Sequence, residues 1–353
     1  MEANKKGFKN LLEQVVIPEA LTLEEREPFL RTLMEYVHRM KPSKLFRYRE
    51  CSEMQFDAFY HDNIYASTAD KFNDPYDCLL RFDKKFIYDS IHKGASKENI
   101  KQLRNYLKDG NEMPTPLKLL YGEALSQQLK EVLQNASDQD LDNYEASFSL
   151  SREVFDSNIE AVLNNAVIYF KQQAHVACFS ETIKSVTMWS HYAKSHTGFA
   201  LEYDLRNIDL KCDNCAQKQD CPNRIIHNLY PVVYTRTRRR YDATNFVDCY
   251  LGRNFGLGTM VDDILFFNKA ALYKSPQWSY EKEWRLFLDK KDSYGLPCLT
   301  AQIKPKAIYY GNNISPINKK ILSDMAKEKG LIEYQMYIDL QSENYSMRYR
   351  KTK

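Results

Sequence analysis

The stretch HVACFSETIKSVTMWSHYAKSHTGFALEYD, residues 175–204, decides the fold because it predicts a strand, a helix and a second strand in succession. The short apolar runs at 175–180 and 197–204 have the length of strands, and the residues between them, 184–194, show helical spacing. Along the rest of the chain, strand-like and helix-like segments mix without strict βαβ alternation. This pattern favours an α+β fold with a mixed or antiparallel central sheet over a doubly wound parallel sheet.

Helical segments flank the predicted strands. Residues 22–40 carry apolar side chains at helical spacing after a capping-box pattern of Thr22 and Glu25. Gly198 is expected to end the preceding helix in a left-handed conformation. The predicted organisation is an N-terminal helical segment (1–40), an α+β core (41–83 plus 173–340), a helical insertion (84–172), a Cys-rich loop within the core (206–228) and a basic tail (341–353).

The composition excludes several classes of protein. Lys plus Arg number 50 and Asp plus Glu 47, and a net charge of +3 argues against binding to nucleic acid or membrane through bulk charge alone. Glycine is scarce (11 of 353 residues), and neither common phosphate-loop motif occurs. There is no apolar run of about 20 residues and no signal-peptide pattern. We therefore expect a cytoplasmic protein with reduced cysteines.

The segment MWSHYAKSH, residues 188–196, offers aromatic side chains with polar tips. Such side chains combine flat faces with hydrogen-bonding groups, which suits the wall of a ligand pocket. One interpretation therefore places Trp189, His191 and Tyr192 around a pocket. The alternative places Trp189 in the core and Tyr192 half-buried.

The segment WSYEKEWRL, residues 278–286, contains paired carboxylates. On a strand, Glu281 and Glu283 would share one face, and neighbouring carboxyl groups can take different pKa values for acid–base chemistry. The alternative is a solvated edge strand in which a glutamate forms a salt bridge with Arg285 or Arg47.

The run FNDPYDC, residues 72–78, predicts a chain reversal in which Asn73 and Asp74 cap a turn. In the alternative, Asp74 or Asp77 lies beside the glutamates, and with Glu283 they would hold Mg²⁺ for phosphodiester cleavage.

Three closely spaced cysteines suggest a metal site. Cys212, Cys215, Cys221 and His227 have ligand types that fit a closed structural zinc site, within a segment that lacks core residues. An iron–sulfur cluster with Cys249 as the fourth ligand, or ordinary free thiols, are the alternatives.

A cluster of arginines follows this loop. With nearby tyrosines it would bind the phosphates of a nucleotide or a nucleic-acid strand, and otherwise it forms a solvated face. The cluster consists of Arg236, Arg238, Arg239 and Arg240.

Four segments together resemble one bacterial family. They are LFRYR (45–49), FNDPYDC (72–78), CFSE with MWSHYAKSHTGFALEYD (178–204), and WSYEKEWRL (278–286) with Lys274 before it. The chain is similar in these to the domain-of-unknown-function 2971 family, over about 41–83 and 174–340. This resemblance implies no established activity.

The order KLFRYR, short helix, NIYAST and late Glu-x-Glu is more distantly similar to ADP-ribosyltransferase-like folds, which implies a split sheet and NAD as substrate. In that resemblance Arg47 contacts the phosphate or ribose side of NAD and Ser67 shapes the nicotinamide pocket. Glu283 holds the ribose 2′-hydroxyl and stabilises the developing cation.

We thus predict an enzyme, with ADP-ribosyl transfer as the leading hypothesis. A metal-dependent phosphodiesterase and a non-enzymatic sensor or interaction module are the alternatives. The predicted catalytic residues are Glu283, Glu281, His191 and Arg47, and the predicted substrate-binding residues are Tyr48, Ser67, Asn73, Asp74, Trp189, Tyr192, Lys274, Trp278 and Arg285.

Overall fold

The computed structural model describes residues 3–18, 21–82, 84–85, 88–89, 92, 96–206, 228–238, 263–288, 301–343 and 345–352. The helices are α1 (Lys5–Gln14), α2 (Leu23–Met40), α3 (Glu53–Tyr60), η1 (Ala69–Lys71), α5 (Lys97–Lys108), α6 (Thr115–Asn135), α7 (Asp138–Gln173), α8 (Val186–Tyr192), α11 (Phe266–Ala270), η3 (Pro276–Glu281) and α12 (Pro316–Glu328). The strands are β1 (Leu45–Arg49), β2 (Asn63–Ile64), β3 (Ser67–Thr68), β4 (His175–Ser180), β5 (Phe199–Tyr203), β6 (Leu229–Pro231), β7 (Val233–Tyr234), β8 (Tyr273–Lys274), β9 (Glu283–Phe287), β10 (Ala301–Gln302), β11 (Ala307–Tyr310), β12 (Ile332–Tyr337) and β13 (Arg348–Lys351).

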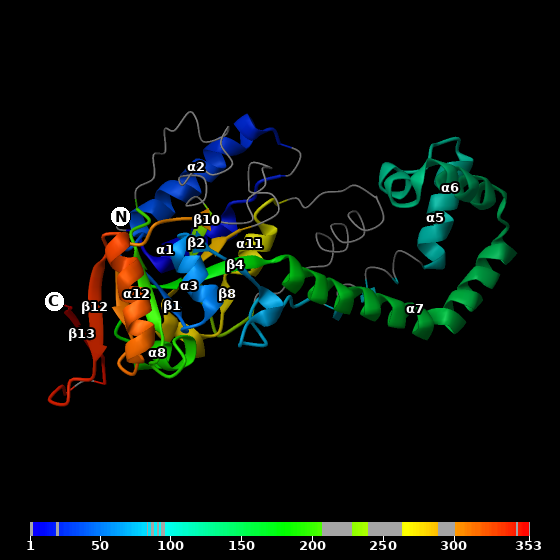
Figure 1. The fold of residues 1–353 in the computed structure, drawn as a ribbon. Coiled ribbons are helices and arrows are strands. Elements are labelled where there is room, and N and C mark those ends of the chain that lie inside the picture. The colour runs from blue at the N-terminus through cyan, green and yellow to red at the C-terminus, as the bar shows by residue number, and fades with distance from the viewer. Residues whose placement is uncertain are drawn as a thin grey trace.

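The main sheet has the strand order β13-β12-β11-β5-β1-β4-β9-β6, and β3 also pairs with β4. Within this sheet, β11 and β12 pair in parallel, whereas its other strand pairs among the described residues are antiparallel. Figure 1 shows the sheet enclosed by helices from distant parts of the chain. The α+β prediction with a mixed central sheet is therefore confirmed.

The register of the central strands decides which side chains share a face. Phe46 pairs with Ser180, and Ser180 pairs with Glu283, so these three residues lie on the same face. Trp189 of α8 packs on this face, with its ring centroid 5.1 Å from that of Tyr48. We call this the α8 face of the sheet.

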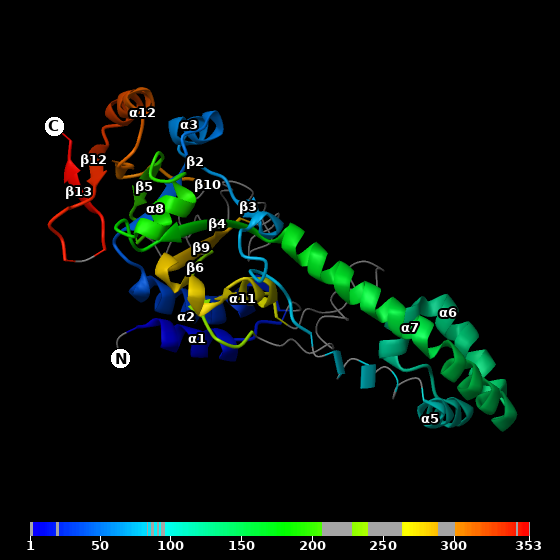
Figure 2. The ribbon, with the colours of Figure 1, turned by 90° about the horizontal axis from the view of Figure 1, so that it is seen from below.

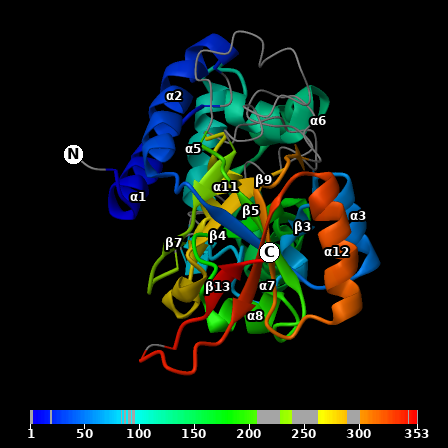
Figure 3. The ribbon, with the colours of Figure 1, turned by 60° about the vertical axis from the view of Figure 1, so that its left-hand side comes forward.

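Other helices cover the opposite face. Phe59 of α3 packs against Phe199 of β5, which points away from α8. Lys329, the residue that ends α12, lies over the ring of Phe59, and Figure 3 shows α3 and α12 side by side. The sheet thus has apolar packing on both faces.

A long helical arm projects from this core. Figure 2 shows α7 running away from the sheet, with α5 and α6 against its distal part. The near end of α7 contacts η1 and β3. No helix among the described residues combines the length and apolarity that crossing a membrane requires.

Some local features predicted from the sequence are present in the structure, and others differ. The capping box of Thr22 and Glu25 is present at α2. The prediction of a left-handed conformation at Gly198 is wrong. Positive φ angles occur instead at residues 194–196, in the turn before Gly198. Residues 348–351, within the predicted basic tail, form the edge strand β13.

Candidate functional site

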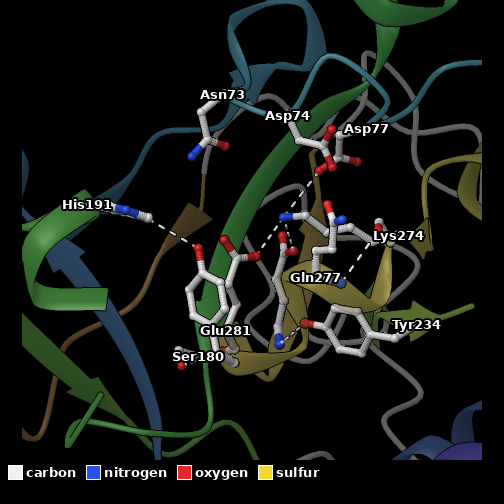
Figure 4. A network of polar contacts seen from close by, with 12 residues as sticks. Asn73, Asp74, Asp77, Ser180, His191, Tyr234, Lys274, Gln277 and Glu281 are labelled. Carbon is white, nitrogen blue, oxygen red and sulfur yellow. Dashed lines mark hydrogen bonds and ion pairs between the residues drawn. The ribbon is translucent and has the colours of Figure 1, made fainter. Parts of the chain in front are cut away.

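The candidate site lies where the start of β9, the end of η3, β8, the end of α8 and the loop at 72–78 meet. Figure 4 shows side chains from these elements pointing toward one another. Lys282 separates η3 from β9 and has a left-handed conformation, with φ of 44°. The prediction that Glu281 and Glu283 share one face of a strand is therefore wrong. The turn at Lys282 nevertheless directs both carboxylates to Lys274.

Arg285 anchors the buried part of the site. Its Nη1 and Nη2 donate to the two carboxylate oxygens of Asp77 at 2.7 and 2.5 Å. Its Nε and Nη2 donate to Glu283 at 2.8 and 3.2 Å, and Nη1 also donates to the carbonyl of Ala271 at 2.6 Å. All five N–H groups of a guanidinium are thereby used, so Arg285 holds the cluster together rather than offering donors to a ligand.

Lys274 joins three carboxylates. Its Nζ lies 2.6 Å from Glu281 Oε2, 3.0 Å from Glu283 Oε2 and 3.4 Å from Asp77 Oδ2. Although burial acts in the opposite direction, these anions raise the pKa of Lys274, so its ammonium stays charged. With Arg285 the cluster contains two cations and three carboxyl groups, all buried.

The two glutamates differ in their protonation behaviour. Burial and the nearby Glu283 carboxylate raise the pKa of Glu281, against the opposing effect of Lys274. Burial also acts to raise the pKa of Glu283, but Arg285 and Lys274 outweigh it and lower that pKa. Glu281 is therefore the carboxyl group that can change its protonation state, whereas Glu283 stays ionised.

Glu281 is connected to the surface through Tyr192. The Tyr192 hydroxyl donates to Glu281 Oε1 at 2.5 Å and accepts a hydrogen bond from Nδ2 of the exposed Asn73 at 3.1 Å. Next to this path, His191 Nδ1 lies 3.2 Å from the hydroxyl of Tyr280. A continuous chain of polar contacts therefore runs from exposed Asn73 to fully buried Arg285.

A pocket of about 270 Å³ opens on the other side of Lys274. Lys274 lines it, and its ammonium lies 5.0 Å from the ring centroid of Trp278. The pocket is lined by Asp74, Tyr76, Leu79, Thr235, Arg236, Arg238, Ala270, Tyr273, Lys274, Ser275, Gln277 and Trp278.

Several predicted site residues lie elsewhere. Arg47 follows Phe46 in β1 and so points to the face opposite Glu283, where its Nη2 donates to the carbonyl of Tyr65. Ser67 pairs with Val176, four residues along β4 from the partner of Glu283, which is a distance of about 13 Å at ~3.3 Å per residue. Two of the three residues expected to contact NAD, Arg47 and Ser67, are therefore outside the cluster, whereas Glu283 is part of it.

Two predicted aromatic residues belong to the core. Trp189 is fully buried and its indole donates to the carbonyl of Ile183 at 2.8 Å. The Tyr48 hydroxyl donates to the carbonyl of Thr182 at 2.6 Å. The core alternative for Trp189 thus agrees with its position.

The structure adds residues to the predicted site. Asp77, which the sequence left between a turn residue and a metal ligand, pairs with Arg285. Tyr234 accepts the backbone N–H of Glu283, at 2.9 Å, and Tyr280, Tyr76 and Gln277 lie at the cluster or pocket. The available signal was membership in the singled-out segments: Asp77 and Tyr76 belong to FNDPYDC, Tyr280 belongs to WSYEKEWRL, and Tyr234 stands beside the arginine cluster. Gln277 carries no such signal.

The predicted metal ligands Cys212, Cys215, Cys221 and His227 lie outside the described residues, as do Arg239, Arg240 and Cys249. Within the described part of the chain, no group of three or more His, Cys, Asp or Glu side chains has an arrangement suited to a metal ion. The zinc and iron–sulfur hypotheses therefore stay predictions.

The fold and the site define an α+β protein with a ligand-sized pocket beside a buried charge cluster. Residues 188–286 match the family model described as "Protein of unknown function (DUF2971)", which confirms the resemblance to that family. The matched part includes Tyr192, Lys274, Glu281, Glu283 and Arg285, but not the loop at 72–78. Comparison with curated proteins and with solved structures gave no match, and the similarity to ADP-ribosyltransferase-like folds has no support from the comparisons.

Proposed function

We propose that the chain is an enzyme in which Glu281 donates and accepts protons at an active site beside the pocket. The observation that carries the proposal is the unequal pairing of two neighbouring buried carboxyl groups: Glu283 accepts from both Arg285 and Lys274, whereas Glu281 accepts from Lys274 and the neutral hydroxyl of Tyr192. The pKa directions, upward for Glu281 and downward for Glu283, agree with this arrangement. Such a pair supplies one carboxyl group that exchanges protons and one that remains an anion. Displaced pKa values beside a pocket are typical of catalytic sites.

The contacts of Glu281 give it two routes to a ligand. One oxygen receives the hydroxyl of Tyr192, which is half-buried and reaches exposed Asn73. The other oxygen receives the ammonium of Lys274, which lines the pocket. A proton can pass between Glu281 and a bound molecule through the Tyr192 hydroxyl, whereas Lys274, which stays charged, links Glu281 to the pocket wall electrostatically.

The specific reaction that we propose is ADP-ribosyl transfer from NAD. A carboxylate beside the reacting ribose stabilises the positive charge that develops there. The geometry supports Glu281 in this role better than Glu283, because both oxygens of Glu283 already accept from Arg285 and one also accepts from Lys274. Arg47 and Ser67 have no part in this version.

The two alternative functions have less support. A divalent cation between Asp77 and Glu283 would meet the charges of Lys274 and Arg285, which lie within 3.4 Å of those carboxylates. This disfavours metal-dependent phosphodiester cleavage at these residues. A non-enzymatic interaction module would need the pocket but not a carboxyl pair with divergent pKa values.

Release of nicotinamide from NAD tests the transferase version. We expect release by the unchanged protein and a loss of about 100-fold or more in Glu281→Gln. Glu202→Gln is a matched control, because Glu202 is also buried and accepts from a tyrosine hydroxyl, Tyr309 at 2.5 Å, and from Lys44 at 3.1 Å. It should release nicotinamide normally.

Two results would contradict these expectations. An unchanged protein that releases no nicotinamide rules out the transferase version. Equal release by the unchanged protein and by Glu281→Gln overturns the role of Glu281.

A further inference from the structure

The pocket beside Lys274 combines cationic and aromatic side chains. Arg236 and Arg238 contribute guanidinium groups, Trp278 and Tyr76 contribute rings, and among its lining residues Asp74 alone is acidic. We infer that this pocket binds a single nucleotide, with its phosphate at Arg236 and Arg238 and its base against Trp278. This assigns a ligand class to the proposed active site and rests on that proposal for its catalytic meaning.

The arginines, and not Lys274, are the phosphate-binding groups. The Lys274 ammonium donates to Glu281 and Glu283 and forms an ion pair with Asp77 at 3.4 Å, so three carboxylates already neutralise it. Guanidinium groups bind phosphate through paired, charge-assisted hydrogen bonds. The pocket therefore favours an anion over a cation at its arginine wall.

Arg238 is held in place before a ligand arrives. Its Nη2 donates to the carbonyl of Leu79 at 2.7 Å and to that of Leu80 at 3.3 Å. Its guanidinium carbon lies 5.5 Å from the ring centroid of Tyr76. Arg236, by contrast, has an exposed side chain at the pocket. A fixed arginine beside an adaptable one suits a phosphate group that enters from solvent.

Trp278 supplies the surface for a base. Its side chain is half-buried and lies at the pocket, with its ring centroid 6.0 Å from that of Tyr280. An aromatic ring can stack on the flat face of any nucleobase. The hydroxyls of Thr235 and Ser275 and the amide of Gln277, which also line the pocket, are groups that hydrogen-bond to a sugar.

The size of the pocket favours one nucleotide. Its volume of about 270 Å³ lies just below the range for small-molecule sites, roughly 300–1,000 Å³. This space suits one base, one sugar and one phosphate better than a dinucleotide or several residues of a strand. If NAD is the substrate, the pocket would hold one of its two nucleotide halves.

Tryptophan fluorescence offers a direct binding assay. The chain has three tryptophans, and Trp189 and Trp284 are 0% exposed, so quenching by a bound base reports on Trp278. The probes are AMP and adenosine, whose binding is followed by this quenching, and ribose 5-phosphate and inorganic phosphate, which lack a base and are measured by calorimetry. We expect AMP to bind at least about tenfold more tightly than each of its parts, because stacking and phosphate contacts both contribute.

Variants separate the two halves of the site. Arg236→Ala should weaken AMP binding about tenfold and leave adenosine binding unchanged, whereas Arg350→Ala, an exposed arginine on β13, should change neither. Trp278→Leu should weaken AMP binding to a similar extent, as measured by calorimetry since the fluorescent group is lost.

Several outcomes would overturn the assignment. Inorganic phosphate binding as tightly as AMP excludes recognition of the base, and adenosine binding as tightly as AMP excludes recognition of the phosphate. A single-stranded oligonucleotide that binds more tightly than AMP, with both weakened by Arg236→Ala, identifies a nucleic-acid strand instead.

The catalytic proposal is tested separately. Glu281→Gln should bind AMP like the unchanged protein. Failure of AMP binding removes the ligand assignment, whereas the nicotinamide-release assay of Glu281→Gln tests the catalytic role, so the two proposals fail independently.

Discussion

The hydroxyl of Tyr192 lies 2.5 Å from Oε1 of Glu281, although 89 residues separate them in the chain. This hydrogen bond connects the end of α8 to the end of η3, and it favours the ionised form of Glu281. It therefore acts against burial and the Glu283 carboxylate, which raise the same pKa.

Replacement of Tyr192 by Phe should raise the pKa of Glu281 further, because the carboxylate loses a donor. It should also lower the free energy of unfolding by about 1–3 kcal/mol. The pKa is measured by ¹³C NMR titration of labelled glutamate carboxyl groups, with the Glu281 signal assigned from its absence in Glu281→Gln. Tyr48→Phe is the control, since the Tyr48 hydroxyl donates to the backbone carbonyl of Thr182 at 2.6 Å. An unchanged Glu281 pKa in Tyr192→Phe would contradict the proposed connection.

The contributions of Glu281 and Glu283 to the free energy of unfolding should depend on pH in opposite directions. The pKa of Glu281 in the folded protein lies above its ordinary value of 4.5, so its stabilising contribution is present below that pH and lost as pH rises through the folded-state pKa. The folded-state pKa of Glu283 lies below 4.5, so its contribution is present above that pH and lost as pH falls.

Urea denaturation over a series of pH values measures both effects. Relative to the unchanged protein, Glu281→Gln should gain stability as pH rises above 4.5, because glutamine resembles the protonated acid. Glu283→Gln should lose relative stability as pH rises from the acid range toward 4.5. Parallel curves for the two variants would refute the divergence of their pKa values.

Features of the fold that depend on neighbouring residues were predictable. The capping box of Thr22 and Glu25 involves groups three residues apart, so its sequence pattern is sufficient. Gly198 shows the limit of this kind of argument. A Cβ there would lie 2.1 Å from the carbonyl oxygen of Arg49, so close packing against β1, rather than a left-handed turn, requires glycine.

The candidate site depended on long-range contacts. The sequence identified both glutamates, Lys274 and Arg285, but Asp77 lies 208 residues before Arg285 and its role required the folded structure. Arg47 was wrongly expected to converge with Glu283, because strand register determines the face of each side chain. A shift of one residue reverses that face, and composition does not encode the register.

The predicted zinc site can be tested without a structure. Elemental analysis of purified protein should give one zinc per chain, and Cys212→Ser with Cys215→Ser should remove it. Cys51→Ser is the control, because Cys51 donates to the carbonyl of Thr197 at 3.5 Å. Iron in place of zinc would favour the cluster alternative, and the absence of both metals would reject the metal hypothesis.

Arg285 should be essential for stability rather than for ligand binding. Arg285→Met leaves Asp77 and Glu283 buried without their principal cation, and the expected loss is about 3–5 kcal/mol in the free energy of unfolding. Arg206→Ala is the control, since Arg206 pairs with Asp204 at the surface and should cost at most about 1 kcal/mol.

A double-mutant cycle distinguishes lost charge pairing from lost packing. If Asp77 is destabilising because it is unpaired, Asp77→Asn should recover part of the stability lost in Arg285→Met, although Asp77→Asn alone destabilises the protein. Denaturation by urea at constant pH measures all four proteins. If the double variant shows the sum of the two single losses, the Asp77–Arg285 contact is not coupled and Arg285 stabilises the fold through its packing instead.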